Sequence, residues 1–131
     1  TKLEKINIEN YFPKEKTISK IRAKKYIWQL RSNMTRNVGL ERNNQSLNQA
    51  FIEFDRIERE SKHLSAKLKD MILISRLITY AAIMRQESRG THYRNDYAKI
   101  DNTFAFSNVF TMEDMNQYLL NKNFAEEANI A

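Results

Sequence analysis

Apolar side chains recur at helical spacing in the first half of the chain, at intervals of three and four residues. The first stripe begins near residue 17 and has these members: Ile21, Ile27, Trp28, Leu30, Met34 and Val38. We expect Gly39 to end this helix as the residue that adopts the left-handed conformation. The polar positions between these members are largely Lys and Arg, which predicts a cationic outer face.

A second amphipathic helix is predicted to begin near Ser46, because Ser46 and Gln49 have the spacing of a capping box. Its apolar face comprises Leu47, Ala50, Phe51, Phe54 and Ile57. The opposite face alternates Glu and Arg, as in an ordinary surface helix. The pattern weakens over residues 61–65, where we expect a short connection.

The third predicted helix differs because residues 71–84 are apolar nearly all round, with only Ser75 and Arg76 interrupting them. A helix without a polar face must be covered on most sides, by a fourth element or by a partner domain. We expect Gly90 to end it. Thr111 then predicts the cap of a last short helix, with Asp114 at its third position, Phe110 and Met115 as a hydrophobic staple, and an apolar stripe of Met112, Met115 and Leu119.

These patterns predict an all-α fold, an antiparallel three-helix bundle plus a short C-terminal helix. We expect one helical domain over residues 1–131. Within it, 1–16 form a lead-in with a possible short extended piece, 17–90 the three main helices, 91–121 a loop and the short helix, and 122–131 a tail. The surplus apolar surface of the third helix and the start at Thr1 favour a piece of a larger protein.

Composition narrows the chemistry of the chain. It has 22 Lys and Arg, 16 Asp and Glu, a net charge of +6 and 41% hydrophobic residues, which is globular rather than disordered. Because cysteine is absent, disulfide and thiolate chemistry are excluded. The two glycines lie far apart, so neither a dinucleotide-binding nor a Walker-type glycine loop can form. No apolar run is long enough to span a membrane, and no signal peptide is expected.

The densest polar cluster spans residues 85–97 and follows the most apolar helix directly. Helical spacing would place Arg85 and Arg89 on one face, where they could grip an anion, pair with Glu87 or Asp96, or bind carbonyls of another domain. A helix C-terminus decorated with cations is the simpler interpretation. His92 could act as a base, but no nucleophile accompanies it, and neither it nor His63 has metal-ligand spacing.

A basic run near the N-terminus raises the possibility of nucleic-acid binding: Lys14, Lys16, Lys20, Arg22, Lys24 and Lys25. Acidic residues remain numerous, and a helix with a solvated cationic face has the same pattern. We therefore favour the solvated face and do not expect nucleic acid as the partner.

Two segments carry a resemblance to a known family. Glu87-Ser88-Arg89-Gly90-Thr91-His92-Tyr93, followed by Asp96-Tyr97, resembles the signature of the C-terminal helical domain of L-aspartate oxidases. The signature also marks the flavoprotein subunits of succinate dehydrogenase and fumarate reductase, usually without the Tyr after the His. Upstream, Leu30–Met34 and Val38–Arg42 are similar to the family's first-helix segment, and the agreement in order covers residues 20–101. Ala98 departs from the family's usual Pro, and the connection between the second and third helices is shorter than in many members.

The resemblance implies a three-helix bundle that packs on flavin-binding and capping domains of the same parent chain. It implies FAD in the parent, none bound by this chain, and a dicarboxylate or amino-acid substrate. Tyr93 favours L-aspartate oxidase, which converts L-aspartate to iminoaspartate for NAD biosynthesis in the cytoplasm. No catalytic residue is expected here; domain docking or support of the site falls to Arg85, Glu87, Ser88, Arg89, Gly90, His92, Tyr93, Asp96 and Tyr97. The alternatives are a succinate dehydrogenase or fumarate reductase flavoprotein, and a basic helical module that binds nucleic acid or protein.

Overall fold

The computed structural model describes residues 17–62 and 65–122 and confirms the all-α fold. The predicted lead-in, most of the predicted tail and His63 lie outside these residues. In chain order the elements are α1 (Thr17–Asn37), β1 (Glu41–Arg42), α2 (Asn44–Glu60), α3 (Ala66–Met84), β2 (Tyr93–Arg94), the 3-10 turns η2 (Asn95–Tyr97) and η3 (Asn102–Phe104), and α4 (Met112–Lys122).

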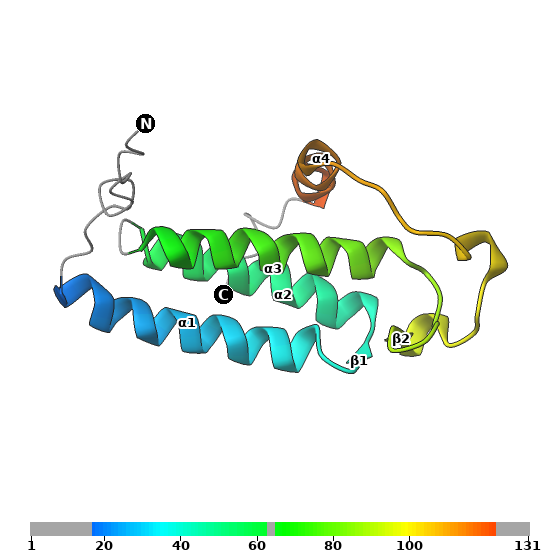
Figure 1. The fold of residues 1–131 in the computed structure, drawn as a ribbon, viewed down its shortest axis with the longest axis horizontal. Coiled ribbons are helices and arrows are strands. Elements are labelled where there is room, and N and C mark those ends of the chain that lie inside the picture. Colours follow the sequence, from blue (N-terminus) through cyan, green and yellow to red (C-terminus); the bar gives the residue numbers. More distant parts are fainter. Residues whose placement is uncertain (1–16, 63–64, 123–131) are drawn as a thin grey trace, which may run out of the picture.

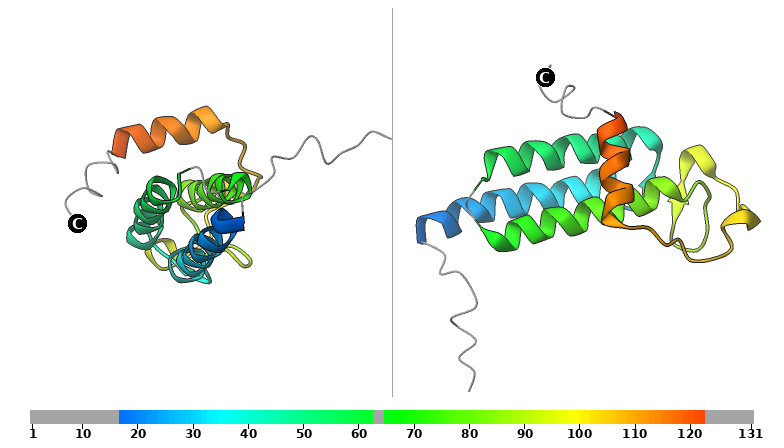
Figure 2. Two further views of the ribbon diagram at one scale, coloured as in Figure 1. Left: turned by 90° about the vertical axis from the view of Figure 1, so that its left-hand side faces the viewer. Right: turned by 90° about the horizontal axis from the view of Figure 1, so that it is seen from above.

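The three long helices lie side by side and alternate in direction (Figure 1). The end-on view shows them at the corners of a triangle, and α4 crosses over α2 and α3 (Figure 2). Both two-residue strands lie at one end of the bundle, beside the C-terminal ends of α1 and α3. That end contains the polar cluster predicted from the sequence.

Helix α2 supplies the centre of the core, as its periodicity predicted. The five side chains of its apolar face are fully buried: Leu47, Ala50, Phe51, Phe54 and Ile57. Burying each large apolar side chain contributes about 1.5–3 kcal/mol, so this face is the main source of cohesion between the helices. The predicted cap is displaced, because Asn43 caps the helix and Ser46 is its reciprocal partner in the capping box.

Helix α1 contributes Leu30 and Val38 to the core, but two members of its predicted stripe lie on the wrong side. Ile21 is 69% exposed and Trp28 is 70% exposed. Trp28 precedes Leu30 by two residues, which is about 200° around a helix, so both cannot face the core. Gly39 follows the helix without a left-handed φ, since within the described residues only Gly90 has a positive φ among the glycines. Instead, a Cβ at Gly39 would lie 2.3 Å from the carbonyl oxygen of Thr35.

Helix α3 begins at a Ser65 cap and ends at Met84, six residues before the predicted Gly90. Arg85 and Arg89 therefore lie in an irregular segment and not on one helical face. Helix α4 covers part of the apolar surface of α3, while Ile74 and Ile78 stay exposed. The fourth helix therefore covers one part of this apolar surface, and the exposed part stays open to the predicted partner domain.

Helix α4 begins as predicted. The Thr111 backbone N–H donates to the Asp114 carboxylate (2.6 Å), and the Asp114 N–H donates to the Thr111 hydroxyl (3.2 Å). Tyr118 packs against the rings of Tyr80 and Phe51, at centroid distances of 5.6 and 6.2 Å. These aromatic contacts join α4 to α3 and α2. Across residues 17–62 and 65–122, no helix is both long enough and apolar enough to cross a bilayer.

Candidate functional site: a charged cluster at the end of the bundle

Two distant segments of the chain meet at the strand end of the bundle (Figure 1). Strands β1 and β2 pair in parallel, with Glu41 opposite Tyr93 and Arg42 opposite Arg94. The sequence did not predict this short sheet. It brings the Val38–Arg42 segment against the Glu87–Tyr97 segment. We call the ionisable groups gathered here the charged cluster: Arg42, Arg85, Glu87, Arg89, His92, Arg94 and Asp96.

Glu87 is the buried centre of the charged cluster, with no solvent exposure. Its carboxylate accepts hydrogen bonds from Arg85 Nη1 (2.6 Å), Arg89 Nε (3.0 Å) and the backbone N–H of Asp101 (2.9 Å). The Arg89 hydrogen bond, with those from Asp101 and Arg85, lowers the pKa of Glu87 to about 2, although burial raises it. Glu87 is therefore ionised at neutral pH and acts as an acceptor, not as a proton donor.

Arg85 extends the charged cluster into the loop that precedes α4. Its guanidinium donates to the carbonyl oxygens of Phe104 and Phe106, both at 2.8 Å, and to Asn108 Oδ1 at 3.2 Å. Arg89 Nη2 likewise donates to the carbonyl oxygen of Asp101 at 3.2 Å. Both arginines therefore bind Glu87 and backbone carbonyls of this chain; contact with carbonyls of another domain stays a prediction.

Ser88 and Gly90 shape the turn within the Glu87–Tyr97 segment, between Arg89 and His92. The Ser88 hydroxyl accepts from the backbone N–H of Arg94 (2.9 Å) and lies 2.8 Å from the carbonyl oxygen of Tyr97, to which it donates. The backbones of Arg89 and His92 exchange two hydrogen bonds across the turn, at 2.8 and 3.0 Å. Gly90 has a φ of +57°, a conformation that side chains with a Cβ disfavour.

Arg94 is the most buried cation of the charged cluster and was not among the predicted site residues. It is 1% exposed. Its Nη1 donates to the last carbonyls of α3, those of Ala82 (3.2 Å) and Ile83 (2.7 Å). Its Nε and Nη2 bind the Asp96 carboxylate in a bidentate pair, at 2.9 and 2.6 Å. The only signal in the sequence was its position inside the polar run, two residues before an acid.

Asp96 connects this pair to α2. The carboxylate accepts from the backbone N–H of Asn44 at 2.8 Å, at the first turn of α2, where the helix dipole favours a negative charge. Its hydrogen bonds from Arg94, with that from Asn44, lower the pKa of Asp96. Arg94 and Asp96 thereby hold the end of α3 against the beginning of α2.

His92 connects the end of α3 to β1 in the same way. Its Nε2 lies 3.1 Å from the carbonyl oxygen of Arg85 and must donate to it. Its Nδ1 therefore accepts from Arg42 Nη1 at 2.7 Å, which assigns the neutral Nε2–H tautomer. Burial, together with the positive charges of Arg42, Arg94 and Arg85, lowers the pKa of His92.

Arg42 also caps the C-terminal end of α1. It belongs to the family segment Val38–Arg42, and no role was predicted for it. Its Nε donates to the carbonyl oxygens of Val38 (3.0 Å) and Gly39 (2.9 Å), just beyond the helix. Burial lowers the pKa of Arg42. The charged cluster thus binds the ends of all three long helices.

Four exposed side chains with apolar surface belong to the segments that form the charged cluster. Leu40 is 85% exposed and Ile100 is 63% exposed, and the rings of Tyr93 and Tyr97 are partly exposed. The Tyr97 ring lies 4.7 Å below the Arg94 guanidinium. Arg89 is the most exposed arginine of the ion pairs here, and its Nη1 has no partner in the described part of the chain.

The chemical capacity of the charged cluster follows from these contacts. Its carboxylates and most of its guanidinium nitrogens are satisfied by one another and by backbone. In the described ranges no group of three or more His, Asp or Glu side chains is placed to hold a metal ion. The arrangement can fix backbone geometry and present a surface. Both ring nitrogens of His92 are engaged, by Arg42 and by the carbonyl oxygen of Arg85.

Comparison with known proteins gives one family and several relatives. The sequence profile described as "Fumarate reductase flavoprotein C-term" matches residues 28–126. An L-aspartate oxidase of Rhodospirillum rubrum is 40% identical over 75 residues, which are 57% of this chain and 26% of that protein. An uncharacterised FAD-dependent oxidoreductase of Methanocaldococcus jannaschii is 35% identical over 52% of this chain and 14% of its own length.

An L-aspartate oxidase of Acinetobacter baylyi is 34% identical over 56% of this chain and 15% of its own length. The chain thus matches about a quarter or less of each of these relatives. No solved structure gives a significant match.

Proposed function

Because the chain belongs to the family of fumarate reductase flavoprotein C-terminal domains, we propose that it is the C-terminal helical domain of an FAD-dependent L-aspartate oxidase. In this proposal the parent enzyme oxidises L-aspartate to iminoaspartate in the cytoplasm, for NAD biosynthesis. Two relatives named L-aspartate oxidase, 40% and 34% identical, support the choice of substrate. Tyr93, directly after the His of the motif, supports it too.

The residues of this chain do not fit a role in holding FAD alone. The chain has two glycines, far apart, and no glycine loop for a pyrophosphate. Within the charged cluster, most guanidinium nitrogens are already engaged by Glu87, Asp96 and backbone carbonyls. We therefore assign FAD to other domains of the parent, and the isolated chain should be colourless and inactive.

We assign the charged cluster to support of the docking surface, with no catalytic role. The observation that carries this assignment is the meeting of both family segments at β1 and β2, where the two carboxylates pair with Arg85, Arg89 and Arg94 of the same cluster. What remains for a neighbouring domain includes the exposed side chains of Leu40, Tyr93 and Ile100, which we call the apolar rim, together with Arg89 Nη1, which has no partner among the described residues. An apolar rim beside a rigid base suits the flavin-binding and capping domains of the same chain.

The first test is absorbance between about 350 and 500 nm, where oxidised flavin absorbs. We expect a yellow parent protein, bleached by L-aspartate under anaerobic conditions, and a colourless 131-residue chain. Bleaching by succinate instead would move the assignment to a succinate dehydrogenase or fumarate reductase flavoprotein. A colourless parent that retains no flavin after gentle purification would contradict the proposal.

A second test concerns Arg89 in the parent enzyme. We expect Arg89→Ala to lower the melting temperature of the parent or its turnover, because the variant removes an ion pair to Glu87 and the hydrogen bond to the carbonyl oxygen of Asp101. Lys99→Ala, an exposed cation of the same loop, is the matched control. Unchanged kinetics together with an unchanged melting temperature for Arg89→Ala would remove Arg89 from the docking surface.

A further inference from the structure

The outer face of α1 is a second surface, on which exposed apolar side chains lie among cations that form no ion pair in the described part of the chain. We define it by six exposed side chains: Ile21, Lys24, Lys25, Trp28, Arg31 and Arg36. From Thr17 to Asn37 the helix carries six Lys and Arg and no Asp or Glu, so it accounts for the whole net charge of +6. None of the exposed cations on this face forms an ion pair within residues 17–62 and 65–122.

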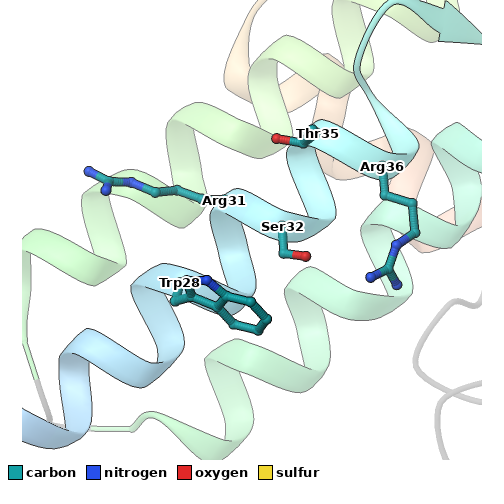
Figure 3. Close-up of a pocket in the computed structure, with 5 residues that line it drawn as sticks. All are labelled: Trp28, Arg31, Ser32, Thr35 and Arg36. Atoms are coloured by element: carbon teal, nitrogen blue, oxygen red, sulfur yellow. The ribbon is translucent and has the colours of Figure 1, made fainter.

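An apolar line runs through these cations. Ile21 and Trp28 are seven residues apart, which places them two turns apart on one side of the helix. Figure 3 shows Trp28, Ser32 and Arg36 along the same side of α1. A shallow hollow of about 400 Å³ is lined by Trp28, Arg31, Ser32, Thr35 and Arg36. An exposed Trp beside Arg is the composition typical of a binding hot spot.

We propose that the outer face of α1 binds a separate protein. The surface of that partner has an apolar centre surrounded by acidic side chains. The partner inserts an apolar side chain between Ile21 and Trp28 and places carboxylates opposite Lys24, Lys25 and Arg31. Charge complementarity of this kind sets the association rate and the choice of partner. The surface lies away from the charged cluster, so it is independent of the role proposed above.

Other occupants fit the face less well. A second copy of the chain would oppose its cations with the same cations, because α1 has no acidic residue. Nucleic acid would use the cations but would leave Ile21 without a contact. The permanent interface with the parent's own domains should be depleted of charge at its centre, whereas this face of α1 has four exposed cations, Lys24, Lys25, Arg31 and Arg36.

The single tryptophan of the chain makes the test direct, because Trp28 emission reports this face alone. The probe is a synthetic acidic helix of about four heptads, with leucine at a and d and glutamate at e and g. Titrated into the 131-residue chain, it should shift Trp28 emission to the blue. A duplex DNA of equal charge should bind at least about tenfold more weakly at physiological salt.

Three substitutions test the specificity of this binding. Arg31→Glu should weaken peptide binding about tenfold or more, since a like charge then faces the acidic rim. Lys69→Glu, an exposed cation on α3, changes the net charge equally and should leave binding unchanged. Ile21→Ser should weaken binding while retaining its salt dependence, and circular dichroism confirms that each variant is folded.

Four outcomes would overturn the proposal. Tighter binding of DNA than of the peptide would make α1 a nucleic-acid surface. Equal effects of Arg31→Glu and Lys69→Glu, or no response of Trp28 to the peptide, would show that no specific site exists. Binding to the isolated chain but not to the parent protein would show that the parent's own domains occupy the face.

Discussion

Replacing Arg94 by alanine tests whether the charged cluster holds the bundle together. The substitution removes a side chain that is 1% exposed and donates to Ala82, Ile83 and Asp96. It leaves two helix-end carbonyls without a donor and the Asp96 carboxylate without its counter-ion. Each buried acceptor left unsatisfied costs about 1–3 kcal/mol. The Asp96 side chain is 29% exposed, so loss of its counter-ion adds less than breaking a fully buried pair, and we expect about 3–5 kcal/mol in all. Since a domain of this kind is stable by only about 5–15 kcal/mol, the loss is a large fraction of the total.

Urea denaturation followed by circular dichroism measures this loss. With a slope of about 2 kcal/mol per molar urea, the midpoint of Arg94→Ala should fall by roughly 2 M. Arg94→Lys keeps the charge but lacks the planar fork, so it should lose about 2 kcal/mol. Arg22→Ala, an exposed cation of α1, is the control and should stay within about 0.5 kcal/mol of the parent sequence. A loss below about 1 kcal/mol for Arg94→Ala would refute the reasoning, because water would then be satisfying the exposed carbonyls and carboxylate.

Three further perturbations probe the same region. The pKa of Glu87 falls from 4.5 to about 2 on folding, so its contribution to the free energy of unfolding is complete above pH 4.5 and is lost as pH falls toward 2. Glu87→Gln should therefore have a lower urea midpoint than the unsubstituted protein at pH 7. The difference between the two midpoints should shrink as pH falls. Burial, with Arg42 and other cations, lowers the pKa of His92 below 6.5, so the unfolded chain binds this proton at a higher pH than the folded chain. The free energy of unfolding should therefore fall as pH drops below 6.5, and His92→Gln should make this pH dependence weaker. The same pH dependence in both proteins would contradict the assignment. Gly90→Ala should cost about 1–2 kcal/mol in thermal melts through its positive φ alone, as a Cβ there meets no atom within 4 Å; no loss would show that the turn relaxes.

The bundle was predictable because helical amphipathicity is a local property. The apolar face of α2 stands within eleven consecutive residues, and all five predicted members are fully buried. The boundaries were less predictable. Polar residues near a helix end offer several caps, and the structure uses Asn43 with Ser46 where the sequence suggested Ser46 with Gln49. Met84 ends α3 because the backbone beyond it turns to place Glu87 inside, which no local pattern shows.

The residues of the charged cluster were partly predictable, but their partners were not. Arg42 lies 50 residues from His92, and Asn44 lies 52 residues from Asp96, yet each pair is in hydrogen-bond contact. Such pairings exist only after three helices have packed and β1 has met β2. A dense run of charges also predicts solvation as readily as burial. The sequence could identify the run, while the buried position of Arg94 required the fold.

The same contacts argue against reading the perturbed pKa values of the charged cluster as a sign of catalysis. Perturbed groups gather at active sites, but structural ion pairs perturb pKa values equally well. Here each shift has a structural cause: Glu87 is held by two arginines and Asp96 by a third, and His92 is buried between Arg42 and the end of α3. A catalytic acid or base needs an atom within hydrogen-bond reach of the substrate. The carboxylates and the imidazole of the charged cluster already form hydrogen bonds within the cluster and to backbone groups. In the function proposed above, these groups fix the backbone at this end of the bundle, so that another domain of the parent protein can pack against Leu40, Tyr93 and Ile100.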